Sequence, residues 1–220
     1  MRGRQPAKAQ RDRSSIAKVR DARTEITIGA EIREVRQARG LTLKDLSRMS
    51  GRSVAHLSKI ERGSTRLTVE LLADISSALK VDPKWFFPSR TGHGPLERSC
   101  VVRAQARRPL SGLYTRSFAE LGFADQLLSS TLTGSFYLCL STFPPSVRDV
   151  SPNRELYAFE GEQHGLVMKG QLELRLGDEI IELRAGDSFS FSSEIPHRLQ
   201  TIGDEETTVV WGMAPVRISW

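Results

Sequence analysis

The chain has 220 residues, of which 39% are hydrophobic, and a formal net charge of +6. This length suits two small domains, with a single domain as the alternative. Two distant cysteines, Cys100 and Cys139, lack a C-x-x-C spacing, which excludes a disulfide framework or zinc knuckle; we expect both to pack as small apolar residues. No apolar run reaches the length of a signal peptide or the roughly 18 residues of a membrane span, so the sequence predicts a cytoplasmic protein with no membrane partner.

The charge is distributed unevenly along the chain. Residues 1–90 hold 20 Lys and Arg against 10 Asp and Glu, whereas residues 91–220 hold 12 against 16. A basic module gains free energy on DNA by releasing counterions, while an acidic module repels phosphate. We therefore expect the two halves to have different roles. Residues 1–26 are basic and almost free of apolar side chains, which predicts a disordered arm that either contacts phosphates or only solubilises the chain.

Residues 27–88 have helical periodicity and predict a domain of five short helices. The first contains Ile28, Ile32 and Val35 and ends at Gly40. The second begins at the capping residue Thr42, with Asp45 three residues on. Its predicted apolar face is formed by Leu43, Leu46 and Met49. The third helix follows the turn at Gly51 and is capped by Ser53. Its predicted buried stripe is formed by Val54, Leu57 and Ile60. Thr68 caps a fourth helix with Leu71, Leu72, Ile75 and Leu79, and Asp82-Pro83 begins a fifth with Trp85 and Phe86 as anchors.

A stretch rich in Pro and Gly follows and predicts a linker over residues 89–98. Beyond it, over residues 99–220, the periodicity changes to the alternation of β-strands. The strands that we expect lie within residues 135–143, 171–176, 180–184, 188–191 and 207–211. Short strands joined by tight turns favour a mostly antiparallel sandwich or barrel.

The segment from Leu43 to Arg62 resembles the helix-turn-helix of the lambda-repressor-like, or XRE, family of bacterial regulators. Leu46, Gly51, Leu57 and Ile60 occupy the family's apolar and glycine positions, whereas Ser47 and Arg52 depart from its usual Ala and small apolar residue. The resemblance implies a lambda-repressor-like DNA-binding domain with double-stranded DNA as its partner.

A helix fits the major groove when a second helix braces it, so we expect the third helix to contact the bases. The predicted base contacts come from the N-terminal and exposed positions Ser53, Val54, Ala55, His56 and Lys59. The predicted phosphate contacts lie near helix ends at Thr42, Arg52, Arg62, Ser64 and Arg66. The alternative is a protein-interaction domain whose surface is basic for solubility.

Two strings in the second half, GEQHGLVMKGQLEL and RAGDSFSFSSEIPHRL, resemble the two motifs of the cupins, jelly-roll β-barrels that follow this DNA-binding domain in many regulators. Cupin enzymes hold a metal with histidines and a glutamate. Here Gln163 takes the glutamate position, Phe159 a histidine position, and Thr201 that of a usual Asn, so that His197 alone matches. His164 should face away from the interior. We therefore expect no metal and no other cofactor.

An apolar interior with a few polar groups suits a small-molecule effector. The predicted lining residues are Tyr157, Phe159, Gln163, Phe189, Phe191 and His197. In the alternative, the barrel only dimerises the chain: Phe189, Phe191 and the leucines at 172, 174 and 176 are then plain core, and His197 is satisfied by a core hydrogen bond.

These patterns together predict a homodimeric, sequence-specific transcription regulator, more consistent with a repressor than with an activator, and without catalytic residues. Its half-sites should lie roughly 34 Å apart. The chief alternative is a metal-dependent cupin oxygenase or epoxidase that carries a helix-turn-helix domain. A second alternative is an antitoxin-like interaction module, although the long segment after the linker argues against it.

Overall fold

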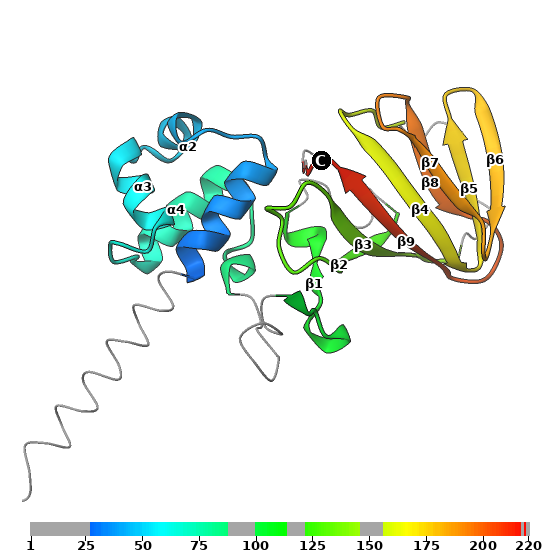
Figure 1. Ribbon diagram of the computed structural model, residues 1–220, viewed down its shortest axis with the longest axis horizontal. Helices are drawn as coiled ribbons and strands as arrows, with labels where there is room; N and C mark the ends of the chain where they lie inside the picture. Colours follow the sequence, from blue (N-terminus) through cyan, green and yellow to red (C-terminus); the bar gives the residue numbers. More distant parts are fainter. Residues whose placement is uncertain (1–26, 88–99, 114–121, 146–155, 217, 219–220) are drawn as a thin grey trace, which may run out of the picture. The chain divides into compact units, whose positions relative to one another are not determined.

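The computed structural model describes residues 27–87, 100–113, 122–145, 156–216 and 218 (Figure 1). The chain folds into two compact units. The first consists of the described residues up to Gln37 together with Leu41–Leu79. The second consists of Ala38–Gly40 and the described part of Lys80–Trp220. The predicted basic arm and linker lie outside the described residues. No helix among the described residues has the length and apolar character needed to cross a membrane.

The first unit is helical. Its first helix is described over residues 27–38, and α2 (Leu43–Ser50), α3 (Val54–Glu61) and α4 (Val69–Leu79) follow. The core residues are almost fully buried, as the helical periodicity predicts: Ile32, Leu46, Leu57, Ile60, Ile75 and Leu79. Thr42 and Asp45 form a reciprocal capping box at α2, Ser53 caps α3, and Gly51 closes α2 with a left-handed φ of 67°. These local predictions are confirmed.

The prediction of a fifth α-helix is wrong. Residues Pro83–Phe86 form a single 3-10 turn, η1, because only four residues separate the Asp82 cap from Phe87, too few for a ladder of i to i+4 bonds. Trp85 and Phe86 are nevertheless buried, as expected of anchors. The described chain thus has four α-helices.

Two apolar side chains that the sequence predicted on buried helix faces, Met49 and Val54, lie on the surface of the helical unit. Met49 is 45% exposed, so the apolar face of α2 is narrower than predicted, and Val54 is 39% exposed at the start of α3. Both residues flank the turn between α2 and α3. Val54 therefore belongs to the surface of α3, and Leu57 and Ile60 alone form its buried stripe.

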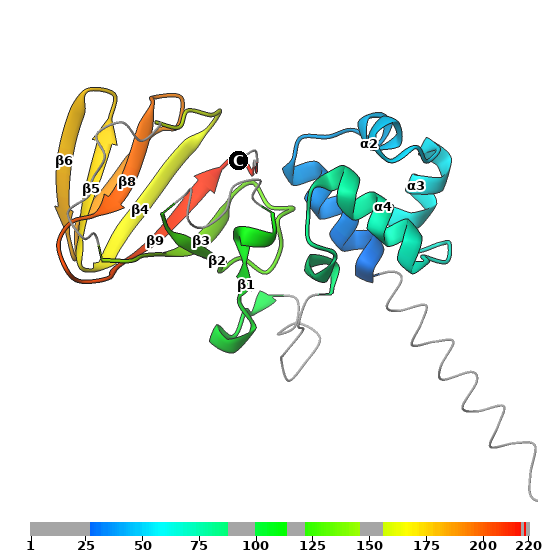
Figure 2. The ribbon, with the colours of Figure 1, turned by 180° about the vertical axis from the view of Figure 1, so that it is seen from behind.

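The second unit is built from antiparallel strands in two sheets. Their bounds are β1 Arg108–Pro109, β2 Ala124–Leu127, β3 Tyr137–Phe143, β4 Glu162–Lys169, β5 Gln171–Leu176, β6 Glu179–Arg184, β7 Ser188–Ser192, β8 His197–Thr201 and β9 Thr207–Ala214. One sheet has the order β1-β2-β3-β9-β4-β7 and the other β6-β5-β8. Figure 2, seen from behind, shows β5, β6 and β8 together at the end of this unit opposite β1 and β2. Short 3-10 turns, η2 (Ala104–Ala106) and η3 (Leu110–Gly112), flank β1.

Among the described residues the two sheets do not join into the closed barrel that we predicted. A bulge between Val167 and Lys169 and a left-handed turn at Gly170 carry the chain out of one sheet and into the other. As a result β4 pairs with β7 and β9, whereas β5 pairs with β6 and β8. The architecture is therefore a β-sandwich with separate edges.

The interior of the second unit contains Leu172 and Leu174, as predicted for the alternating segment of β5. Cys139 is also buried, on β3. The prediction for Cys100 is wrong, because this residue is exposed. The described residues contain both cysteines in the free form.

Gly29 allows the first helix to approach α3 closely. A Cβ atom at this position would lie 2.2 Å from the carbonyl oxygen of Ile60 and 3.2 Å from the carbonyl carbon of Glu61. Both neighbours are backbone atoms near the end of α3, and backbone cannot move aside as a flexible side chain can. Gly29 therefore sets how closely the two helices pack.

We predict that Gly29→Ala destabilises the helical unit by about 1–3 kcal/mol, the usual cost of overpacking. Helix propensity alone predicts the opposite sign, because Ala stabilises a helix interior by about 1 kcal/mol relative to Gly. Denaturant unfolding followed by far-ultraviolet circular dichroism decides between them. A stabilised Gly29→Ala variant would show that the helix contact is looser than described.

Candidate DNA-binding surface and ligand pocket

The N-terminal part of α3 presents a continuous exposed surface. Ser53, Val54, Ala55 and Lys59 are exposed and His56 is half-buried, so all five predicted base-contact residues are accessible, while Leu57 and Ile60 face the core. The Ser53 hydroxyl accepts a hydrogen bond from the backbone N–H of His56 at 3.3 Å. This bond orders the first turn of α3.

The predicted phosphate-contact residues lie around the same surface, and all five are exposed. Arg52 forms an ion pair with Asp74 of α4, and Arg62 donates to the Ser58 hydroxyl. The Ser64 hydroxyl donates to the carbonyl of Lys59 at 3.0 Å. These contacts hold the two guanidinium groups and one hydroxyl beside the ends of α3.

Thr42 is less available than the sequence suggested. Its backbone N–H and its hydroxyl both donate to Asp45, at 3.0 and 2.6 Å. The hydrogen bond from the Thr42 hydroxyl holds the pKa of Asp45 below its usual value, so the carboxylate stays charged beside it. A phosphate would have to displace this carboxylate to contact Thr42.

The C-terminal end of α3 is fixed by a buried ion pair. Arg36 on the first helix donates to both carboxylate oxygens of Glu61, with Nε–Oε1 at 2.6 Å and Nη2–Oε2 at 2.9 Å. The remaining guanidinium nitrogen donates to the carbonyl of Leu41 at 2.7 Å. The side chains of Arg36 and Glu61 are only 10% and 6% exposed. This bidentate geometry is the strong form of the interaction, and it ties α3 to the first helix and to the start of α2.

Two further contacts shape the turn and the end of α3. The Ser47 hydroxyl donates to the carbonyl of Arg52 at 2.6 Å, so the departure from the usual Ala adds a hydrogen bond across the turn. After α3, Gly63 adopts a left-handed φ of 64°, and the N–H groups of Gly63 and Ser64 donate to Ile60 and Lys59. This pattern is a Schellman motif, which satisfies the last carbonyls of the helix.

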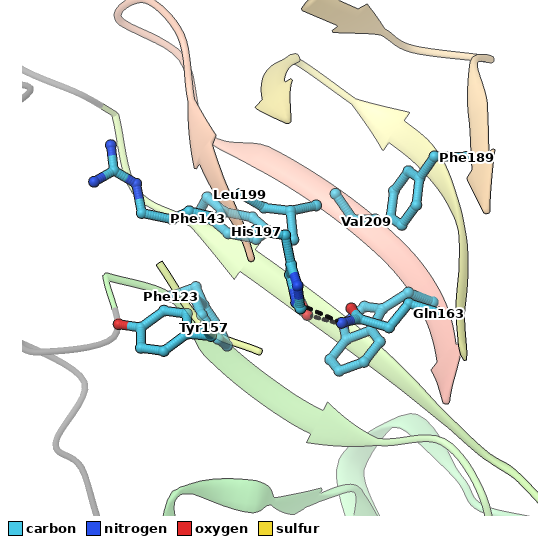
Figure 3. Close-up of a pocket in the computed structure, with 11 residues that line it drawn as sticks. Phe123, Phe143, Tyr157, Gln163, Phe189, His197, Leu199 and Val209 are labelled. Atoms are coloured by element: carbon cyan, nitrogen blue, oxygen red, sulfur yellow. Dashed lines mark hydrogen bonds between the residues drawn. The ribbon is translucent and has the colours of Figure 1, made fainter. Parts of the chain in front are cut away.

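The second unit contains a pocket between its two sheets (Figure 3). It has an empty volume of about 520 Å³, which includes space open to solvent. Residues from both sheets line it: Phe123, Ser141, Phe143, Tyr157, Gln163, Phe189, His197, Arg198, Leu199, Val209 and Trp211. The pocket thus brings together four of the six predicted lining residues.

The other two predicted lining residues, Phe159 and Phe191, do not line the pocket. Their rings pack edge-on against the ring of His197, with centroids 5.3 and 4.8 Å away. These two side chains support His197 from behind instead of contacting the pocket. His164 is exposed and lies 3.5 Å from Glu162, so it faces away from the interior as predicted.

His197 and Gln163 form a hydrogen-bonded pair across the two sheets. His197 Nδ1 lies 2.7 Å from the carbonyl oxygen of Ile195, and its Nε2 lies 2.7 Å from the side-chain nitrogen of Gln163. A carbonyl can only accept, so Nδ1 carries the proton. Burial lowers the pKa of His197, which keeps the ring neutral and leaves Nε2 as an acceptor for the Gln163 amide.

This donor set does not fit a metal centre. The Nε2 lone pair of His197 is already used by Gln163, and an amide nitrogen is no ligand. No group of three His, Cys, Asp or Glu side chains with metal-binding geometry is found within the described ranges. We therefore derive no metal chemistry for this pocket.

The aromatic wall of the pocket depends on a glycine. Gly165 on β4 pairs with Phe189 on β7, and a Cβ atom at residue 165 would lie 2.2 to 2.8 Å from the Phe189 ring. The ring therefore lies directly over the glycine. Any larger residue at 165 would push Phe189 out of its place.

Sequence reasoning missed several residues that the structure places in these sites. In the pocket these are Ser141 and Phe143 on β3, and Val209 and Trp211 on β9, which are buried while Leu140, Thr142, Thr208 and Val210 between them are half-buried. Alternate residues of a strand point to the same face, so this alternation in the sequence could have identified them. In the helical unit, Gly29, Arg36 and Glu61 carried no such signal, because their contacts depend on how helices pack.

Comparison with known proteins gives one family match in each half of the chain. Residues 32–86 match the helix-turn-helix family, and residues 157–213 match the cupin domain family. Most of the helix-turn-helix match lies in the first unit, whereas its residues 38–40 and 80–86 belong to the second. The protein joins this XRE-type domain to a C-terminal cupin domain, the pair expected from the sequence motifs.

Solved structures resemble the chain over most of its length but at low identity. A helix-turn-helix family transcriptional regulator from Vibrio cholerae is 19% identical, with 88% of this chain and 98% of that chain covered and a TM-score of 0.38. Hydroxypropylphosphonic acid epoxidase from S. wedmorenis is 14% identical, with 86% and 97% covered and a TM-score of 0.41. We transfer no residue's role from either structure.

We predict that Glu61→Ala lowers the free energy of unfolding of the helical unit by about 3–5 kcal/mol, because it leaves the Arg36 charge buried without its partner. The double variant Arg36→Met/Glu61→Met should recover most of this loss, since both charges are then removed. Denaturant unfolding followed by circular dichroism gives both values.

Arg48→Ala is the matched control, because Arg48 pairs with Asp45 while its own side chain is 78% exposed. An exposed pair contributes less than about 1 kcal/mol. If Glu61→Ala cost no more than Arg48→Ala, the buried pair would not be what fixes α3.

Proposed function

We propose that this protein is a sequence-specific transcription regulator, acting in the cytoplasm as a homodimer on a pseudo-palindromic operator, and more consistent with repression than with activation. The observation that carries the proposal is the exposed face of α3 from Ser53 to Lys59, presented by a helix whose far end is fixed by Arg36 and Glu61. A helix anchored in this way keeps a constant angle to its brace, α2, as major-groove recognition requires.

The residues around this face divide into two groups by their chemistry. The Lys59 ammonium is exposed and has no partner among the described residues, so it is free to donate to a guanine O6 or N7. Val54 and Ala55 present methyl groups suited to a thymine methyl. Arg62 lies at the end of α3 and is held by Ser58, which suits a phosphate contact that sets register.

We predict that Lys59→Ala costs about 1–3 kcal/mol on the preferred operator and less on other sequences, so that sequence preference relaxes. Arg62→Ala should weaken binding to all duplexes alike and lower the salt dependence by about one counterion. Fluorescence anisotropy with duplexes from upstream of its own and adjacent genes, titrated with salt, measures both. Equal effects of the two substitutions on all sequences would contradict this division.

A homodimer needs a self-complementary surface, and the outer face of the six-stranded sheet has this character. We define the outer sheet face as Leu138, Leu140, Val210, Leu166 and Met168; register places Leu140, Val210 and Leu166 side by side across β3, β9 and β4. Leu138, Leu166 and Met168 are 38%, 41% and 54% exposed. An antiparallel sheet commonly has one solvated face, and polar side chains usually cover it.

The charges around this face favour a second copy as its occupant. Glu162 and Lys169 lie at opposite ends of β4, with Leu166 between them. Two copies of β4 crossing antiparallel about a two-fold axis near Leu166 would place Glu162 of each against Lys169 of its partner. Such an isologous arrangement pairs opposite charges around an apolar centre.

We predict that Leu166→Glu converts the dimer to a monomer, because two like charges would meet at the axis. Ile180→Glu, at a 60% exposed residue on the other sheet, is the matched control and should leave the dimer intact. Analytical ultracentrifugation at micromolar concentration measures the state. Monomeric wild-type protein would overturn the homodimer, and dissociation by Ile180→Glu alone would place the interface on the other sheet.

The cupin unit has the role of an effector site in this proposal, and no enzymatic reaction is assigned to it. An effector that binds one arrangement of the dimer more tightly would change operator affinity by that difference. The described lining offers one neutral imidazole and no carboxylate, which suits binding rather than metal-dependent oxidation. Stoichiometric iron in protein purified without chelator would overturn this part and favour an oxygenase.

A further inference from the structure

The pocket is lined by an amide oxygen that accepts no hydrogen bond from the described residues. The hydrogen bond to His197 turns the nitrogen of the Gln163 amide toward the ring, because Nε2 can only accept. The amide oxygen, Oε1, is left facing away from the ring. Gln163 is 3% exposed and lines the pocket, and its oxygen accepts no hydrogen bond from the described residues. Figure 3 shows Gln163 and His197 directed toward one another inside the pocket.

A molecule that donates one hydrogen bond to Oε1 gains affinity there, because a hydrogen bond made inside an apolar pocket is stronger than one made in water. The surrounding wall is apolar and largely aromatic, with Phe123, Phe143, Phe189 and Trp211 as its rings. Such a wall selects a molecule with a flat or aliphatic body and a single polar donor.

The charged side chain of the lining is already hydrogen-bonded within the protein. The charged residue of the lining is Arg198, which donates to the side-chain oxygen of Gln200. Gln200 in turn donates to the carboxylate of Glu173 at 2.7 Å. The guanidinium is thus already part of a network that ends at a carboxylate, and His197 is neutral.

We propose that the cupin unit binds, without metal, an uncharged and mainly apolar or aromatic molecule that donates one N–H or O–H hydrogen bond to Oε1 of Gln163. The Gln163–His197 pair occupies the place where a cupin metal would lie and acts as a neutral polar anchor. This inference specifies the effector class of the proposed regulator, although the binding itself requires no DNA.

Indole and 1-methylindole are a matched pair of probes, because they share a ring system and differ in the N–H donor. We expect indole to bind full-length, chelator-treated protein about tenfold more tightly than 1-methylindole, as a single buried hydrogen bond provides. Isothermal titration calorimetry measures both affinities, with benzoate as the charged comparison. Equal binding of the two indoles, tighter binding of benzoate, a requirement for added iron or zinc, or binding of no probe would each overturn the proposal.

Two variants separate the hydrogen bond from the shape of the pocket. Gln163→Met combined with His197→Phe removes Oε1 without leaving Nε2 of His197 as a replacement acceptor, so the preference for indole should fall below about twofold. Gly165→Ala displaces the Phe189 ring and should weaken both probes by the same factor, leaving their ratio unchanged. A preference that persists in Gln163→Met/His197→Phe would overturn the assigned acceptor. Because calorimetry uses no DNA, this outcome is independent of operator binding, which anisotropy with and without indole tests separately.

Discussion

A single buried ion pair holds the C-terminal end of α3, the helix that presents the candidate DNA-binding surface. Arg36 uses its guanidinium to hold the Glu61 carboxylate and the Leu41 carbonyl at once, and so joins three segments that are far apart in sequence. Because the pair is buried, each charge needs the other as its partner, since either charge alone would be poorly solvated. The backbone contact at Gly29 acts on the same end of α3. The side of α3 that remains exposed is therefore fixed from its C-terminal end.

The cupin unit reuses a metal-binding architecture with a different chemistry. A cupin motif normally brings anionic and imidazole ligands together, which is favourable only with a cation between them. Replacing the carboxylate by the Gln163 amide lets the two side chains bond to each other directly, with one donor and one acceptor. The edge-on rings of Phe159 and Phe191 then favour the neutral imidazole, because they exclude water from it. The site keeps its geometry and changes the class of ligand that it suits.

The sequence predicted the features that depend on near neighbours. The caps at Thr42 and Ser53, the turn at Gly51 and the alternation of β5 involve residues within a few positions of each other. The short 3-10 turn was misassigned because Asp82-Pro83 is an equally good start for either kind of helix. The contacts that build the two sites could not be predicted from local sequence patterns, because their partners are distant in the chain. Arg36 and Glu61 are 25 residues apart, and Gln163 and His197 are 34 residues apart. Likewise, the open edges of the sandwich depend on strand pairing, which no local pattern specifies.

The contact between Gly165 and Phe189 links pocket size to backbone position. The Phe189 ring lies directly on the backbone of β4, and glycine has no side chain that could change conformation. Residue 165 therefore cannot change the size of the cavity. Phe189 reaches over the glycine from β7, so a smaller side chain at position 189 would uncover the strand and enlarge the cavity without moving the sheet. The size of the cavity is then set by one position, while the residue opposite it has to remain a glycine.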